Sequence, residues 1–130
     1  DLRRRAARLL QAALQGPGEG YRIALSDFGV SGGQALADLL EHVDGWLRAL
    51  ASAASGATDH AASRDAHDWL DSTARTHGLH PVDLARAIEL VDQARLEARG
   101  NVSPQLVVAG LIAELRSVLI GPGARTGAAR

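Results

Sequence analysis

Four of the five histidines, His60, His67, His77 and His80, lie within 21 residues and are interleaved with aspartates. Histidine and carboxylate side chains are common metal ligands, and on a helix they share a face at a spacing of three or four residues. His77 and His80 have this spacing, but Gly78 stands between them and is expected to end a helix. The chain has no His-Glu-x-x-His motif. We therefore expect solvated histidines at helix ends, with no native metal ion or other cofactor.

His67 and Asp68 also form a His-Asp dipeptide similar to that of the HD-type phosphohydrolases, which are all-α enzymes with a metal site. The resemblance implies an earlier histidine and a later aspartate as further ligands. His42 or His60, and Asp92, are the candidates for these positions. A small metal-dependent phosphohydrolase is therefore one alternative function, and the metal content of the purified protein would test it.

The basic cluster of the chain lies in its first expected helix and consists of Arg3, Arg4, Arg5 and Arg8. Arginines on a helix can contact phosphates, so a small helical DNA-binding domain is a second alternative. The whole chain, however, has 14 basic and 15 acidic residues and a net charge of -1 at pH 7. Because nucleic-acid-binding domains are usually strongly basic, we expect the cluster to be a solvated face or a contact within a larger protein.

Other signatures of catalysis are missing from the sequence. The absence of Cys excludes a disulfide framework, a thiolate zinc site and a cysteine nucleophile. The glycine-rich segment 16–20 lacks the Lys-Ser/Thr pair of a phosphate-binding loop. Ser31 precedes two glycines, but no strand is predicted before it, as a nucleophile elbow requires. We expect no catalytic residues, no small-molecule ligand and no enzymatic activity in this chain.

The composition predicts which elements position these side chains. Ala, Leu, Arg and Glu favour helices, whereas aromatic residues make up 3% of the chain and β-branched residues are scarce. Gly, Pro and capping residues divide the chain into helices expected at about 2–15, 21–28, 32–54, 64–77, 81–99 and 104–120. The expected fold class is all-α, a compact bundle of about five to six helices in one domain over residues 1–120. Residues 121–130 are expected to form a disordered tail.

Apolar residues recur at spacings of three and four and predict the inward face of each expected helix. They are Leu2, Ala6, Leu9, Leu10, Ala13 and Leu14; Leu36, Leu39, Leu40, Val43, Leu47 and Leu50; Ala66, Trp69, Leu70, Thr73 and Ala74; Leu84, Ala85, Ile88, Val91 and Ala94; and Val107, Val108, Leu111, Ile112, Leu115 and Leu119. Four apolar residues lie off these stripes, namely Leu79, Val82, Leu90 and Leu96. They either fill the core of slightly rotated helices or belong to a surface that binds a partner.

Residues 94–118 read ARLEARGNVSPQLVVAGLIAELRSV. A charged helix, an Asn-x-x-Pro-Gln-Leu segment and a final apolar helix resemble the C-terminus of bacterial DNA polymerase III clamp-loader subunits, above all the delta-prime type. The gamma/tau and delta subunits have related domains. The residues that match the family's Asn-x-Asn-Pro-x-Leu segment are Asn101, Pro104, Gln105 and Leu106. Ser103 replaces the second Asn with another good N-cap residue. Ala109 and Glu114 depart from the family, which often has an acidic residue and then an arginine in this helix.

The resemblance implies a collar domain of a longer AAA+ subunit. In that family, the helical domains of five subunits form a closed ring, and the AAA+ modules beneath it place the sliding clamp on primed DNA. The chain has no Met and opens with Asp1 in an amphipathic pattern, so we expect it to be a fragment of a longer protein. The resemblance implies no ATP site, zinc module or arginine finger in this fragment.

The expected function is therefore oligomerisation, with other clamp-loader subunits as partners and only indirect contact with DNA. No apolar run approaches the roughly 20 residues of a membrane span, so we expect a cytoplasmic protein without membrane contact. Candidate contacts are the start of the last helix and exposed parts of the preceding helices. The candidate interface residues are Leu79, Leu90, Arg95, Arg99, Asn101, Ser103, Pro104 and Gln105.

Overall fold

The computed structural model describes residues 2–15, 33–56, 64–100 and 103–120. Its helices are α1 (Leu2–Gln15), α3 (Gly33–Ala54), α4 (Arg64–His77), α5 (Pro81–Ala98) and α6 (Pro104–Leu119). No strand occurs in these ranges. The predicted all-α fold is confirmed, and the five helix boundaries agree closely with those expected from Gly, Pro and capping residues. The helix expected at 21–28 and the tail expected at 121–130 lie outside the described residues.

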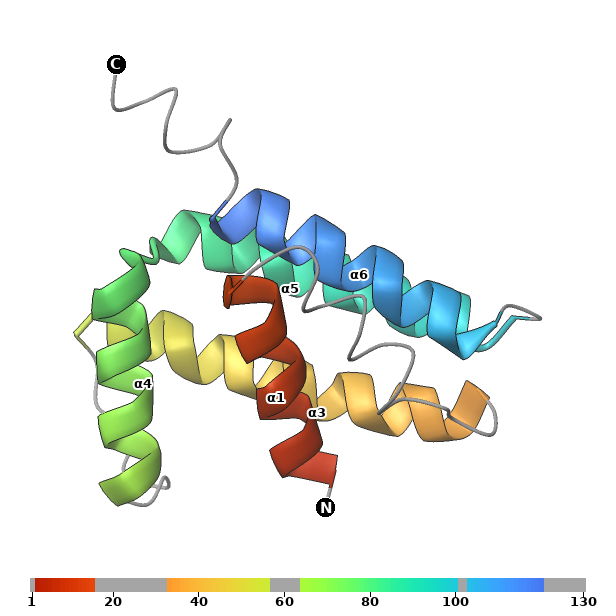
Figure 1. Ribbon diagram of the computed structural model, residues 1–130, viewed down its shortest axis with the longest axis horizontal. Coiled ribbons are helices and arrows are strands. Elements are labelled where there is room, and N and C mark those ends of the chain that lie inside the picture. The colour runs from red at the N-terminus through yellow and green to blue at the C-terminus, as the bar shows by residue number, and fades with distance from the viewer. Residues whose placement is uncertain (1, 16–32, 57–63, 101–102, 121–130) are drawn as a thin grey trace.

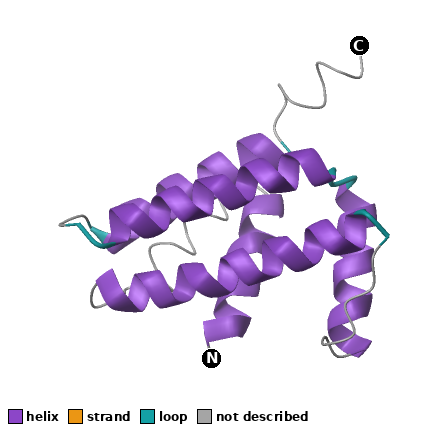
Figure 2. Cartoon of the chain, turned by 180° about the vertical axis from the view of Figure 1, so that it is seen from behind, coloured by secondary structure: helices purple, strands orange, loops and turns teal. Residues whose placement is uncertain are grey.

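The longest helix, α3, is the centre of the bundle and packs against α5, α1 and α4. The last helix, α6, lies beside α5 and also contacts α1. Figure 1 shows α3, α5 and α6 along the long axis of the molecule, with α1 crossing them steeply. Helix α4 lies at one end, and the last turn of α5 and the first turn of α6 lie at the other, as the view from behind in Figure 2 also shows.

A single hydrophobic core joins all five helices. The inward faces predicted for α3 and α6 are buried in full, and that of α1 is buried or packed against the core. On α4, Leu70 and Ala74 are buried and Trp69 packs against the core, whereas Ala66 and Thr73 are half-buried. The largest side chains with almost no exposure are leucines: Leu9, Leu10, Leu36, Leu39, Leu40, Leu47, Leu50, Leu84, Leu111, Leu115 and Leu119. Each such side chain contributes about 1.5–3 kcal/mol relative to an exposed position.

The inward face of α5 is rotated from the predicted one. Ala85 was expected to be buried but is exposed, and Ala87, which no stripe included, is completely buried. The stripe observed has spacings of three and four throughout: Leu84, Ala87, Val91, Ala94 and Ala98. Ala85 and Ala87 are equally apolar, so the sequence pattern did not distinguish them. The packing of α5 between α3 and α6 selects the face that carries Ala87.

The end of α4 explains why Leu79 belongs to the core. Gly78 has a φ of +59°, a left-handed conformation that favours glycine. The N–H of Gly78 donates to the Arg75 carbonyl at 3.3 Å, and the N–H of Leu79 donates to the Ala74 carbonyl at 3.0 Å. These two bonds form a Schellman motif, in which the residue after the glycine turns back onto the helix. Leu79 is consequently 6% exposed.

Proline begins both helices of the last hairpin. Pro81 and Pro104 occupy the first turns of α5 and α6, where the missing N–H removes no intrahelical bond. Ser103 has the extended backbone of an N-cap residue, as predicted, but its hydroxyl makes no capping bond. The hydroxyl lies 3.4 Å from Oε1 of Gln105 instead.

Aromatic contacts join the start of α1 to α3 and α4. The indole Nε1 of Trp46 donates a 2.9 Å hydrogen bond to the carbonyl of Arg3, whose guanidinium lies 4.3 Å above the same ring. Trp69 meets Trp46 edge to face, with the ring centroids 5.1 Å apart. The stacking of Arg3 is a cation–π contact, and such contacts are worth about 0.5–1 kcal/mol at exposed sites.

We expect Leu47→Ala, at a completely buried position of α3, to lower the free energy of unfolding by about 2–5 kcal/mol, because it leaves a cavity among packed helices. Urea denaturation followed by tryptophan fluorescence measures the effect. The matched control is Leu106→Ala, since Leu106 is 71% exposed and its truncation should change stability by about 0.5 kcal/mol at most. Equal losses for the two variants would contradict the assigned core.

Candidate subunit interface

The structure brings several predicted interface residues together at the connection between α5 and α6. Arg99 is exposed as the C-cap residue of α5, and Ser103, Pro104 and Gln105 are half-buried where α6 begins. Asn101 lies outside the described residues. The polar and backbone groups at this end of the molecule are therefore placed at the surface, where a partner can reach them.

Arg95, by contrast, is turned toward the body of the protein. Its Nη1 lies 3.4 Å from Oδ2 of Asp44 on α3 and 3.7 Å from Oδ1 of Asp92 on α5. Arg48 approaches the other oxygen of Asp44 at 3.3 Å, although without the alignment of a hydrogen bond. This network joins α3 to α5, so Arg95 serves the fold of the domain and is only partly available to a partner.

Asp44 is the buried charged residue within the described part of the chain, and its residue exposure is 7%. Burial raises the pKa of its carboxyl group above the usual value, because it disfavours the charged form. The neighbouring carboxylate of Asp92 acts in the same direction, whereas Arg48 lowers the pKa. The raised pKa means that Arg48 only partly offsets the cost of burying this charge.

The apolar residues left off the predicted stripes divide into two groups. Leu79 is in the core, with an exposure of 6%, and Leu90 is half-buried and packed against the core, so neither is a prominent part of the surface. Val82 and Leu96 are exposed, at 72% and 61%. The third large apolar side chain exposed in the described ranges is Leu106 of the Pro-Gln-Leu segment. Sequence reasoning had matched Leu106 to the family motif without assigning it to the interface.

The outer face of α6 is the least polar surface of the described helices. Leu106, Gly110, Ala113 and Ser117 are all exposed, and their spacings of four, three and four place them on one stripe, with the exposed Glu114 beside it. Of the helix's sixteen residues, only Glu114 and Arg116 are charged. The guanidinium of Arg116 donates a 3.2 Å hydrogen bond to the Ala13 carbonyl on α1, so it serves packing within the domain.

The exposed face of α5 provides a contrast within the same hairpin. Four charged residues line it: Arg86, Glu89, Asp92 and Glu97. Water satisfies these four charged groups, although Val82 and Leu96 are exposed on the same helix. The stripe on α6, by comparison, has only Ser117 and the neighbouring Glu114 as polar side chains. The comparison marks α6 as the helix whose exposed side is best suited to contact another protein.

The candidate metal ligands remain on separate elements. His67 and Asp68 lie on α4, His42 lies on α3 and Asp92 lies on α5. Within the described ranges, no three His, Asp or Glu side chains are grouped so that they could hold a metal ion. His60 lies outside these ranges. Asp92 is placed beside Arg95, as described above.

The basic cluster on α1 is partly used within the domain. Arg3 stacks on Trp46, and neither Arg5 nor Arg8 is without an interaction partner. The cluster lies in the first turns of α1, near the positive end of the helix dipole.

None of the described helices is both long enough and apolar enough to cross a bilayer. Comparisons with protein-family models, with curated proteins and with solved structures find no significant match for this chain.

We expect the stability of the protein to depend on pH through Asp44. The folded-state pKa of this carboxyl is raised, so the folded protein binds the proton more tightly than the unfolded chain. Its contribution is therefore fully present below the unfolded pKa of about 3.9 and is lost as the pH rises through the folded pKa. The isosteric variant Asp44→Asn lacks this titration, so its stability relative to the wild type should increase over that interval. Urea unfolding at several pH values measures the difference, and a relative stability that decreases with pH would contradict it.

Proposed function

We propose that this chain is a helical oligomerisation module that joins the collar of a bacterial DNA polymerase III clamp loader, with α6 as its principal contact. The observation that carries the proposal is the exposed, nearly uncharged stripe along the outer face of α6. A helix face with few charged side chains is normally buried, yet this side of α6 is exposed in the isolated domain. Burial of Leu106 alone would contribute about 1.5–3 kcal/mol to association.

The position of this stripe agrees with the resemblance to the collar family. The matching segment, 101–106, ends in Leu106, and α6 corresponds to the final helix of the collar domain. The two exposed leucines of the hairpin, Leu96 and Leu106, flank this same connection. The resemblance and the exposed apolar residues thus indicate the same end of the molecule.

A closed ring requires each domain to contact two neighbours. A standard interface buries about 800 Å² per partner, so two of them would cover about a fifth of the 7299 Å² surface of the chain. The charged residues beside the stripe, Arg99 and Glu114, would lie at the rim, where charge influences partner choice more than affinity. In such an assembly the domain holds AAA+ modules in place and contacts DNA only indirectly.

The proposal predicts a defined hetero-oligomer when this domain is mixed with the C-terminal domains of the other clamp-loader subunits of the same organism. Native mass spectrometry measures the stoichiometry and identifies the neighbours. Leu106→Glu should weaken this assembly by about tenfold or more, because it replaces the one large apolar side chain of the stripe with a charged one. The fold should be unaffected, since Leu106 is 71% exposed.

The matched control for this substitution is Val82→Glu. Val82 is 72% exposed, on the charged face of α5, so the same change in charge should leave assembly unaltered. If the mixture contains only monomers, the collar assignment is wrong. If both variants assemble like the wild type, α6 is not the contact.

A further inference from the structure

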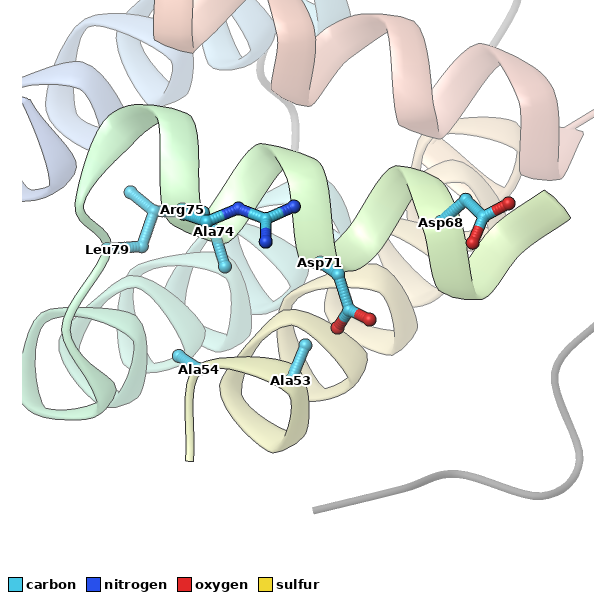
Figure 3. Close-up of a pocket in the computed structure, with 7 residues that line it drawn as sticks. All are labelled: Ala53, Ala54, Asp68, Asp71, Ala74, Arg75 and Leu79. Atoms are coloured by element: carbon cyan, nitrogen blue, oxygen red, sulfur yellow. The ribbon is translucent and has the colours of Figure 1, made fainter. Parts of the chain in front are cut away.

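A cleft of about 540 Å³ lies between the end of α3 and the outer side of α4, as Figure 3 shows. Its apolar wall consists of small or branched side chains: Ala53, Ala54, Ala74 and Leu79. Asp68, Asp71 and Arg75, all on α4, supply its charged groups. Cavities of roughly 300–1,000 Å³ accommodate drug-sized molecules, so this one has room for two long side chains.

The charges of the cleft favour a cation that carries an apolar neighbour. Asp68 and Asp71 are exposed, and neither forms an ion pair within the described part of the chain. Together with Arg75 they give the cleft a net charge of -1. The C-terminal end of α3 adds the negative end of a 22-residue helix dipole beside Ala53 and Ala54. An arginine beside a leucine matches both the charge and the apolar wall.

The same chain has an exposed arginine and two exposed leucines near its other end. Arg99 is exposed and unpaired among the described residues, and Leu96 and Leu106 lie on either side of the α5–α6 connection. We name this group of three residues the hairpin end. Figure 1 places the last turn of α5 and the first turn of α6 at one end of the long axis and α4 at the other. A contact between the hairpin end and the cleft must therefore come from two different molecules.

We propose that a second copy of this chain inserts its hairpin end into the α3–α4 cleft, with Arg99 facing Asp68 and Asp71 and Leu106 against the alanines. Because the two surfaces differ and lie at opposite ends, the contact is head to tail and generates a ring or an open chain of copies. The inference shares Leu106 with the proposed function but does not require the sister subunits. A contact of this small size should be weak, with a Kd between about 10 µM and 1 mM.

The first test is the sedimentation of the wild type as its concentration is raised through this range. The average mass should increase with concentration. Asp68→Arg/Asp71→Arg, which reverses the charge of the cleft, and Arg99→Glu/Leu106→Glu, which reverses that of the hairpin end, should each weaken self-association about tenfold or more. Val82→Glu should behave like the wild type. All these positions are exposed, and thermal unfolding of each variant verifies that it folds.

The decisive test mixes the cleft variant with a neutral hairpin-end variant, Arg99→Ser/Leu106→Ser, so that the two altered surfaces do not attract each other through opposite charges. Each retains one of the two surfaces, so a head-to-tail contact can form only once and the mixture should stop at a mixed dimer. A symmetric contact through α6 would not be restored in this way. The inference is overturned if the wild type stays monomeric at 1 mM, or if the mixture forms no dimer while the wild type self-associates. Assembly with the sister subunits is measured separately. Its failure would overturn the proposed function, whereas the head-to-tail contact is tested by sedimentation alone.

Discussion

The burial of one face of α3 is the constraint on which the rest of the bundle depends. Its six inward residues, Leu36, Leu39, Leu40, Val43, Leu47 and Leu50, are at most 2% exposed, and three other helices pack directly on α3. The helices that cover it supply alanines as well as leucines, such as Ala6 and Ala13 on α1 and Ala87 and Ala94 on α5. Small side chains let helix axes approach closely, so a core with few aromatic residues still reaches the density of a protein interior.

The same interface contains the buried carboxylate of Asp44. Its raised pKa shows that the charged form is disfavoured there in spite of two neighbouring arginines. A buried ion pair often contributes little to net stability, because the cost of desolvation offsets the Coulomb attraction. The buried apolar residues of α3 and α5 therefore contribute most of the stability of the α3–α5 contact. The network instead determines the orientation of Arg95, which would otherwise be free to reach a partner.

The helices differ in how much of their apolar surface is covered by neighbouring helices. α6 packs on α5 and α1 with one side, and the residues on its other side have no neighbour within the described part of the chain that covers them. The charged face of α5 needs no such cover. The collar proposal and the head-to-tail inference both depend on this imbalance, since both use Leu106. They differ in whether the cleft beside α4 also takes part.

Several features were determined by the sequence alone. The helix boundaries follow from Gly78, Pro81 and Pro104, because glycine and proline restrict where a helix can begin and end. The inward faces of α3 and α6 follow from apolar spacing, because 3.6 residues per turn place such positions on one side.

Other features were decided only by the tertiary structure. Periodicity ranks the positions within one helix but does not define the direction in which its neighbours lie. The rotation of α5, which exposes Ala85 and buries Ala87, therefore depends on packing against α3 and α6. The cation–π contact of Arg3 with Trp46 and the ion pair of Arg95 with Asp44 each join residues that are far apart in the sequence. The cleft is likewise lined by two separate helices, α3 and α4. Leu79 is intermediate: a leucine after Gly78 is typical of a Schellman motif, but its burial required a core for it to turn toward.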